Sequence, residues 1–134
     1  MQTSLAAQVL RPVKPTPSPW RKQLGDLKEK QARDYLERQG LRHVASNVRC
    51  KRGELDLVMH DGDTLVFIEV RFRTTGRFGG AAASIDSRKQ ARLSAAAAYY
   101  LQRHPVDLPC RFDVIAIDGA GAIQWIRHAF VASL

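Results

Sequence analysis

Two β-rich runs joined by a short turn constrain the fold of this 134-residue chain more than any other feature. The runs are ELDLVM at 54–59 and TLVFIEVRF at 64–72, and the turn HDGD lies between them at 60–63. Asp61-Gly62 between two such segments is a strong indication of a β-hairpin. The second run has the composition of a buried central strand, interrupted by one charged residue, Glu69. We therefore expect an antiparallel strand pair with a carboxylate in its interior.

The turn also predicts which side chains share a face of the hairpin. If these two residues form the turn, Glu54 lies opposite Glu69, and Asp56 lies opposite Phe67. Side chains alternate with period two along a strand. One face of the hairpin would therefore carry Glu54, Asp56, Glu69 and Arg71. A four-residue turn preserves this grouping, whereas a three-residue turn would break it.

Carboxylates that face one another on a sheet repel, at a cost of up to ~1 kcal/mol when they are exposed and more when they are buried. Two kinds of partner could relieve this repulsion. Arg71 could form a salt bridge with Glu69 or Asp56, which would leave Glu54 in solvent. Alternatively, a divalent cation such as Mg²⁺ suits one or two carboxylates together with water and a substrate phosphate. The residues alone leave both interpretations open.

The remaining hydrophobic patterns predict two helices and three further strands. The helices are expected over 24–39, ended by Gly40, and over roughly 87–103, capped by Asp86 or Ser87 and ended by Pro105. The strands are expected at 41–49, 112–117 and 123–130, and the small residues of 73–84 form a loop. The order α-β-β-β-α-β-β indicates an α/β fold with a mixed central sheet flanked by helices.

Length and proline content predict the domain organisation. A chain of 134 residues corresponds to one domain. Residues 11–19 hold four of the six prolines, so we interpret 1–20 as a flexible basic tail before a domain at 21–134. No apolar run reaches membrane-spanning length, and MQTSLAAQVL lacks the pattern of a signal peptide, so we expect neither a membrane protein nor a secreted one. Because Cys50 and Cys110 are isolated from each other in sequence, we expect two buried reduced thiols in a cytoplasmic protein rather than a disulfide.

The net charge of +8 makes a polyanion the first partner to consider. All of the excess lies in residues 1–53, and the rest of the chain is neutral. Within that neutral part, residues 54–70 carry five acidic residues and no lysine or arginine, while residues 71–103 carry seven basic residues against Asp86 alone. An acidic segment is therefore flanked by basic stretches. A solvated acidic hairpin is the simpler explanation of the composition, and only the arrangement of the strands argues against it.

Two helical residues are further candidates. Glu29 lies at the edge of the apolar stripe of the first helix, where it could lean over a sheet, although an isolated helical glutamate is usually solvated. Gln90 shares a helix face with Leu93, Ala97 and Tyr100, and a surface glutamine is its simpler interpretation.

The string GELDLVMHDGDTLVFIEVRFR, followed by RFGGAAASIDSRKQARL, resembles the YraN-like family of small, largely uncharacterised bacterial proteins. That family is similar to a compact branch of the PD-(D/E)XK nuclease superfamily, which includes restriction endonucleases and archaeal Holliday-junction resolvases. The resemblance covers about residues 24–130 and implies a restriction-endonuclease-like domain. It also implies a Mg²⁺ or Mn²⁺ cofactor, DNA as partner and, by analogy with the resolvases, a homodimer.

The resemblance implies a metal site on the hairpin. Asp56 and Glu69 would bind the metal, and Glu29 would contribute directly or through water. The backbone carbonyl of Val70 would add a further ligand. Glu54 is a secondary candidate.

The resemblance assigns the basic end of the ExK motif to Arg71 and an assisting helix position to Gln90. Arg71 departs from the superfamily, which usually has lysine there. An arginine stays protonated, so Arg71 would not serve as a general base. It could still orient the attacking water or neutralise charge in the transition state.

Together these features favour a metal-dependent endonuclease that hydrolyses phosphodiester bonds in structured or branched DNA. The phosphates would be held by basic residues on both sides of the acidic segment: Arg49, Lys51, Arg52, Arg73, Arg77, Arg88 and Lys89. No pattern typical of base-edge recognition is present, so we expect specificity for shape. The alternatives are a non-catalytic nucleic-acid-binding protein that keeps the nuclease fold, and a basic cytosolic protein that binds another protein.

Overall fold

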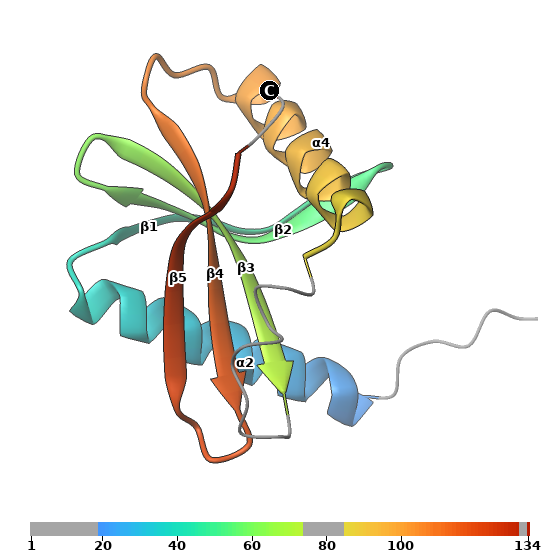
Figure 1. Cartoon of the computed structure of the whole chain (residues 1–134), viewed down its shortest axis with the longest axis vertical. Coiled ribbons are helices and arrows are strands. Elements are labelled where there is room, and N and C mark those ends of the chain that lie inside the picture. Colours follow the sequence, from blue (N-terminus) through green and yellow to red (C-terminus); the bar gives the residue numbers. More distant parts are fainter. Residues whose placement is uncertain (1–18, 74–84, 132–133) are drawn as a thin grey trace, which may run out of the picture.

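Five strands form one mixed sheet, and two helices pack on its opposite faces (Figure 1). The computed structural model describes residues 19–73, 85–131 and 134. In chain order the elements are helix α2 (Pro19–Arg38), strands β1 (Arg42–Cys50), β2 (Gly53–Asp61) and β3 (Thr64–Arg73), helix α4 (Ser87–Arg103), and strands β4 (Cys110–Asp118) and β5 (Ile123–Phe130). The predicted α/β class and the αβββαββ order are confirmed.

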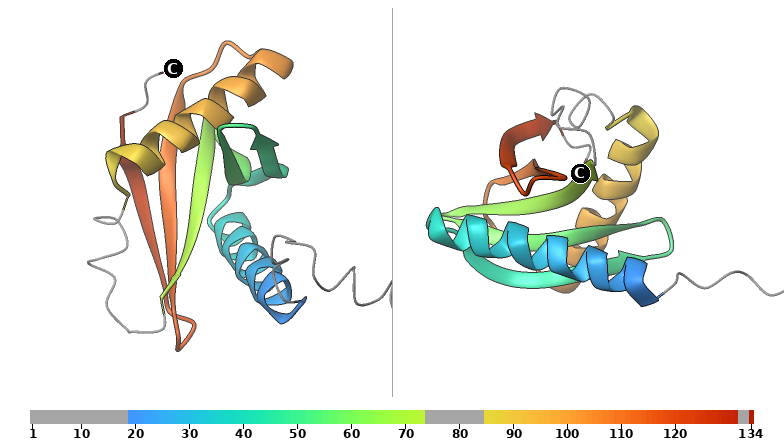
Figure 2. Two further views of the ribbon diagram at one scale, coloured as in Figure 1. Left: turned by 90° about the vertical axis from the view of Figure 1, so that its right-hand side faces the viewer. Right: turned by 90° about the horizontal axis from the view of Figure 1, so that it is seen from below.

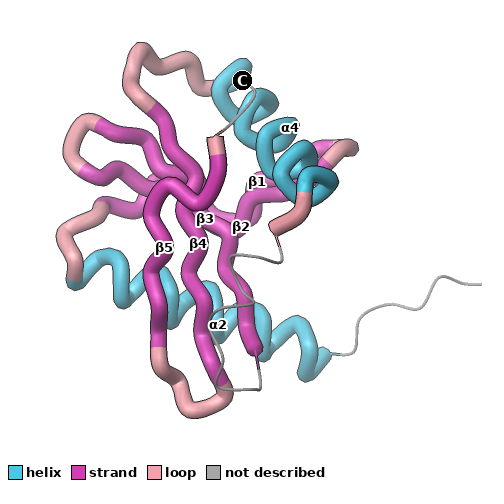
Figure 3. Tube along the Cα trace, in the orientation of Figure 1, coloured by secondary structure: helices cyan, strands magenta, loops and turns pink. Residues whose placement is uncertain are grey.

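The strands lie in the sheet in chain order, β1-β2-β3-β4-β5. Strands β3 and β4 run parallel, and the other neighbouring pairs run antiparallel. Because parallel neighbours cannot be joined by a tight turn, the chain crosses over between β3 and β4, and α4 lies in this crossover. Helix α4 packs mainly against β1 and β2 (Figure 3). Helix α2 covers the other face of the sheet (Figure 2).

Each face of the sheet carries its own hydrophobic cluster. On the α4 face, Leu93 of the helix packs in one cluster with Phe67 of β3. On the α2 face, Leu36 of the helix packs in a second cluster with Ile68 of β3. Burial on both faces explains why the central strand is an almost continuous apolar run in the sequence.

The turn of the β2–β3 hairpin differs from the prediction by one residue. Asp61 pairs with Thr64, so the turn residues are Gly62-Asp63 rather than Asp61-Gly62. The reason is conformational. Gly62 has a φ of 58° at the first central position, as in a type II′ turn, whereas a type I′ turn at the predicted place would need positive φ at Asp61 as well.

The new register overturns two predicted cross-strand pairs. Leu57 now pairs with Ile68, and Val58 rather than Asp56 pairs with Phe67. Glu54 is likewise not opposite Glu69. Because the shift amounts to two residues, it conserves the predicted face of each side chain beside the turn.

Several boundaries also differ from the prediction. Helix α2 begins at Pro19 rather than near residue 24, so the last two residues of the predicted tail are helical. Proline is favoured in the first turn of a helix because no intrahelical partner awaits its missing N–H. The rest of the predicted tail, 1–18, and the greater part of the predicted loop, 74–84, lie outside the described residues. The cap of α4 is Asp86, whose carboxylate accepts the backbone N–H of Lys89 at 2.8 Å.

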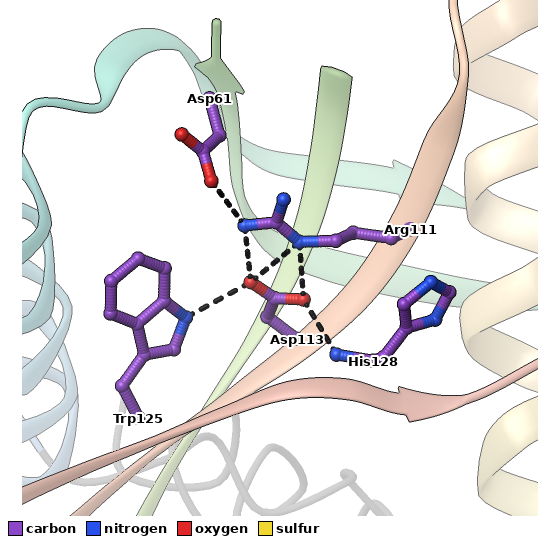
Figure 4. A network of polar contacts seen from close by, with 5 residues as sticks. All are labelled: Asp61, Arg111, Asp113, Trp125 and His128. Carbon is purple, nitrogen blue, oxygen red and sulfur yellow. Dashed lines mark hydrogen bonds and ion pairs between the residues drawn. The ribbon is translucent and has the colours of Figure 1, made fainter.

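A buried polar network joins the β2–β3 turn to β4 and β5 (Figure 4). Asp113 is almost fully buried and accepts hydrogen bonds from Arg111, from the Trp125 indole at 2.9 Å and from the backbone N–H of His128 at 3.1 Å. Arg111 also binds Asp61 at 2.7 Å. Because every partner of the buried carboxylate is a donor, the network is satisfied without a ligand and has a structural role.

Cys50 and Cys110 are both free thiols in the structure, but both are only partly buried, so the prediction that they are buried is wrong. Among the described residues, no helix is both long and apolar enough to cross a membrane.

Candidate functional site

A cleft opens where β2 and β3 separate. Their pairing ends at Leu57 and Ile68. Beyond this point β2 continues beside β1 towards α4, while β3 continues beside β4 (Figure 1). The Asp56 carboxylate accepts the backbone N–H of Val70 at 2.7 Å, where a strand-to-strand hydrogen bond would otherwise follow. Asp56 therefore sits at the fork between the two strands.

An irregularity in β1 and β2 gives Asp56 this position. Asn47 lies across from it on β1 and has a φ of 53°, in the left-handed region. Leu55 packs on the α4 face and Leu57 on the α2 face, although residues two apart on a regular strand share a face. The strict alternation assumed in the sequence analysis therefore fails at Asp56. The signal for this break, an asparagine that tolerates positive φ, was present but ambiguous.

Three carboxyl groups meet at the fork. The pKa of Asp56 is raised to about 8, first by burial and then by the hydrogen bond and negative charge of Glu69, with a further contribution from Glu29. Burial also raises the pKa of Glu29. Its interactions with Asn47 and Asp56 each lower this pKa, but by less than burial raises it. Asp56 is thus the central member of a Glu29–Asp56–Glu69 group, contributed by α2, β2 and β3.

Glu69 is held by two cations. It is 7% exposed, and its Oε2 lies 3.0 Å from Lys89 Nζ of α4 and 3.7 Å from Arg71 Nη1. The salt bridge between Glu69 and Arg71 considered from the sequence is therefore present, and Lys89 is the closer partner. Within the described part of the chain, Arg71 Nη1 is buried without a hydrogen-bond acceptor. It is a donor that a bound anion could use.

The other candidate residues occupy different places. Glu54 lines the same cleft but forms an ion pair with Arg49 at 3.2 Å on its exposed side. Gln90 does not line the cleft, and its side chain donates to the backbone carbonyl of Ile85 at 3.0 Å. Lys89, predicted as a phosphate contact, is the residue of α4 that reaches Glu69.

The cleft has a volume of about 510 Å³ and a basic rim. Its walls include the predicted phosphate contacts Arg73, Arg88 and Lys89. An adjoining cleft of about 640 Å³ contains Arg49, Lys51 and Arg52, and it shares Glu54, Lys89 and Arg92 with the first. The two clefts thus form one basic groove. Arg77, the remaining predicted contact, lies outside the described residues.

Arg92 lines both clefts and was not singled out from the sequence. Its spacing of three from Lys89 places the two side chains on one helix face, and this spacing could have indicated it. Gly53 allows α4 to pack closely on the start of β2, because a Cβ at position 53 would collide with the backbone carbonyl of Arg92.

The donor set fits a hard divalent cation only in part. Among the described residues, no group of three or more His, Cys, Asp or Glu side chains is arranged to hold a metal ion. Asp56 and Glu69 alone, however, provide the one or two carboxylates that Mg²⁺ needs when water and phosphate complete its coordination. Burial and the nearby Glu69 raise the pKa of Asp56 to about 8, and a cation bound between the two carboxyl groups would displace the proton from Asp56.

Comparison with known proteins places the chain in a family. The profile of the uncharacterised protein family UPF0102 matches residues 28–117, which include the three carboxyl groups and all of α4. The chain belongs to this family. The resemblance to the YraN-like family is thereby confirmed.

Curated UPF0102 proteins match over nearly their whole length. A protein of Pseudomonas entomophila is 54% identical over 112 residues, which cover 79% of this chain and 91% of the relative. A protein of Pseudomonas putida is 53% identical over 122 residues, which cover 87% of this chain and 98% of the relative. A protein of Nitrosomonas eutropha is 51% identical over 109 residues, which cover 81% of this chain and 94% of the relative.

Proposed function

We propose that this UPF0102 protein is a metal-dependent endonuclease that hydrolyses phosphodiester bonds in structured or branched DNA. The observation that supports this most is the pair of carboxyl groups, the partly buried Asp56 and the buried Glu69, that meet at the base of a groove rimmed by arginine and lysine. Two acids brought together against their mutual repulsion need a compensating function, and a cation bound beside phosphates supplies one.

In this proposal Asp56 and Glu69 hold one or two Mg²⁺ or Mn²⁺ ions. The backbone carbonyl of Val70 adds a ligand, and Glu29 contributes directly or through water. A divalent cation bound there would supply Lewis acidity and lower the pKa of a coordinated water. Such a metal site would be of the kind found in the PD-(D/E)XK superfamily, which the sequence resembles.

The other residues of the cleft bind and orient the substrate. Arg71 stays protonated, so it holds a phosphate oxygen or the attacking water and takes no proton from it. Its buried Nη1, which lacks a hydrogen-bond acceptor in the described part of the chain, is suited to this role. The basic groove follows the phosphate backbone without reading bases, which favours recognition of shape, as in a junction, a flap or a single strand.

A second candidate function is nucleic-acid binding without cleavage. Lys89 Nζ lies 3.0 Å from Glu69 Oε2 and neutralises this carboxylate in the absence of any metal. Arg71 also stands where the ExK motif usually has lysine. Both features favour a protein that keeps the nuclease fold but no longer catalyses the reaction.

We further propose a cytoplasmic location, because the two free thiols suit a reducing compartment and DNA is the substrate. By analogy with junction resolvases, we propose that the protein acts as a homodimer.

The test is cleavage of branched, flapped and single-stranded DNA with Mg²⁺ or Mn²⁺. The informative variants are Asp56→Asn and Glu69→Gln, which keep side-chain size. Glu37→Gln, in an exposed ion pair with Arg33, is the matched control. We expect the parent and Glu37→Gln to cleave and both site variants to lose cleavage by at least ~100-fold, the order found when a transition-state contact is removed. Cleavage that survives in both site variants would contradict the proposal, and specific binding without cleavage by the parent would favour the second candidate.

A further inference from the structure

A separate apolar cavity adjoins the carboxylate cleft on the α2 side. It has a volume of about 380 Å³, within the roughly 300–1,000 Å³ typical of small-molecule sites. Its apolar walls are Trp20 and Leu24 of α2 and Val70 and Phe72 of β3. It shares Asp56, Val70 and Phe72 with the carboxylate cleft, so the end of β3 forms a wall of both.

The aromatic residue at its edge is unusually accessible. Trp20 is 62% exposed, whereas a large aromatic side chain is normally mostly buried. The Arg21 guanidinium lies 5.7 Å from the Trp20 ring centroid. The second aromatic wall, Phe72, carries the Lys28 ammonium 4.6 Å from its ring centroid. Two aromatic surfaces, each with a cation beside it, therefore line a cavity that opens next to the carboxyl groups.

We propose that this cavity receives an unpaired nucleobase of a nucleic acid whose phosphate lies at the Asp56–Glu69 cleft. This inference rests on the proposed function, and it narrows the substrate class to nucleic acids with an unpaired nucleotide beside the bound phosphate. A flap, a bulge or a single strand has such a nucleotide, whereas a continuous duplex does not.

The chemistry of the walls favours this occupant. A nucleobase has an apolar face that stacks on aromatic side chains, and its phosphates pair with lysine and arginine. Stacking is tolerant of sequence because every base has a π-face, in keeping with a chain that lacks base-edge contacts. The cavity is also lined by Glu29 and Asp56, so its walls carry charges of both signs. Arg21 and Lys28 are the groups that can pair with a phosphate next to the base, and the aromatic faces rather than the charge favour a nucleobase.

The test compares three labelled DNAs of the same duplex sequence in EDTA, so that no cleavage occurs. The first carries a short single-stranded flap, the second carries the same flap made of abasic sites, and the third is fully paired. We expect the parent to bind the flap about 5- to 150-fold more tightly than the abasic flap, which is the range for loss of one base–aromatic stack. The flap should also quench tryptophan fluorescence.

Three variants separate stacking from other effects. Trp20→Ala should abolish the preference for the base-containing flap and leave binding of the abasic flap and the duplex unchanged. Trp20→Phe should keep most of the preference. Leu27→Ala is the matched control, because Leu27 is also 62% exposed on α2 but does not line the cavity.

The outcomes distinguish this inference from the proposed function. If the parent binds both flaps equally, or if Trp20→Ala weakens binding of all three DNAs alike, the inference is overturned while nucleic-acid binding stands. Tryptophan shielded from acrylamide in the free protein would mean that a segment of the chain or a second copy fills the cavity, which also overturns it. Base-dependent binding by a protein that does not cleave DNA with metal supports the inference and overturns the endonuclease. Failure to bind any DNA overturns both.

Discussion

Asp56 is the single residue on which the cleft depends most. Its pKa in the folded protein, about 8, lies above the ordinary value of 3.8, mainly because it is buried. Between these pH values the folded protein keeps a proton that the unfolded chain has released. The free energy of unfolding therefore falls as the pH rises from about 4 to about 8, with a limiting slope of about 1.4 kcal/mol per pH unit for one proton.

Asp56→Asn should remove this dependence, because an amide of the same size does not titrate. We expect the variant to match the parent in stability near pH 4 and to exceed it at pH 8, measured by urea unfolding over this pH range with EDTA present. Asp107→Asn, at an exposed position in the α4–β4 connection, is the control. Parallel pH profiles for the parent and Asp56→Asn would show that Asp56 is ionised in the folded protein.

Sequence reasoning located the candidate residues better than it located their contacts. The residues next to the turn keep their predicted faces because a register error of two residues preserves the face, but the regular alternation fails at Asp56, where Leu55 and Leu57 pack on opposite faces. The contact of Lys89 with Glu69 was missed because no local pattern specifies how a helix is rotated against a strand far away in sequence. The positive φ of Asn47 had only an ambiguous signal in the sequence, since asparagine permits that conformation without requiring it.

At the scale of elements, the packing of α4 on the β1–β2 turn shapes the basic groove. Gly53→Ala would place a methyl group against the backbone carbonyl of Arg92, and backbone atoms cannot move aside cheaply. We expect a loss of about 1–3 kcal/mol in the free energy of unfolding, as for other overpacked sites, measured by urea titration. Gly25→Ala is the matched control, since nothing lies within 4 Å of a Cβ there and alanine favours the helix. Equal stability of Gly53→Ala and the parent would mean that α4 is not in close contact with this turn.

The Asp113 network fixes the opposite end of the hairpin from the fork (Figure 4). Asp113→Ala would leave Arg111 partly unpaired in the interior and remove the acceptor of the Trp125 indole. Breaking a buried ion pair in this way costs about 3–5 kcal/mol, which should appear as a lower midpoint of urea unfolding. Asp107→Ala, at an exposed position, should have little effect. A cost below about 1 kcal/mol would indicate that water replaces the carboxylate.

The elements themselves were largely predictable because their signals are local. Hydrophobic periodicity, the Asp86 cap and the apolar β3 run gave the correct order of helices and strands. The hairpin turn was misplaced by one residue because Gly62 can occupy a central position in either turn: a turn at Asp61-Gly62 needs a positive φ at Asp61 as well, whereas the observed turn at Gly62-Asp63 needs it at Gly62 alone. The start of α2 was placed too late because the prolines before Pro19 were interpreted as a longer tail.

At the scale of the whole molecule, the positive and negative side chains are segregated around the cleft. The net charge of +8 concealed three carboxyl groups that the fold brings together beneath a rim of arginine and lysine. The acidic segment between basic stretches indicated where Asp56 and Glu69 lie, but the same pattern also fitted a solvated acidic hairpin, and Glu29 lies outside it on the first helix. The fork that forms the cleft was not predictable, because it depends on where β2 stops pairing with β3.

Binding of duplex DNA in the groove should be strongly salt-dependent. Arg52→Gln, in the second cleft, should reduce the slope of log Kobs against log salt concentration by about 0.9, the contribution of one phosphate contact, measured by fluorescence anisotropy. Arg103→Gln, exposed near the end of α4 and outside both clefts, should leave the slope unchanged. Equal slopes for the parent and Arg52→Gln would place the DNA elsewhere.

The most direct test of the central claim, that Asp56 and Glu69 form a metal site, is a calorimetric titration with Mn²⁺ at pH 8, where protons compete least. The account predicts binding of one or two ions per chain by the parent and by Glu37→Gln, and loss of this binding in both Asp56→Asn and Glu69→Gln. Mn²⁺ binding by both site variants with the affinity of the parent would contradict it.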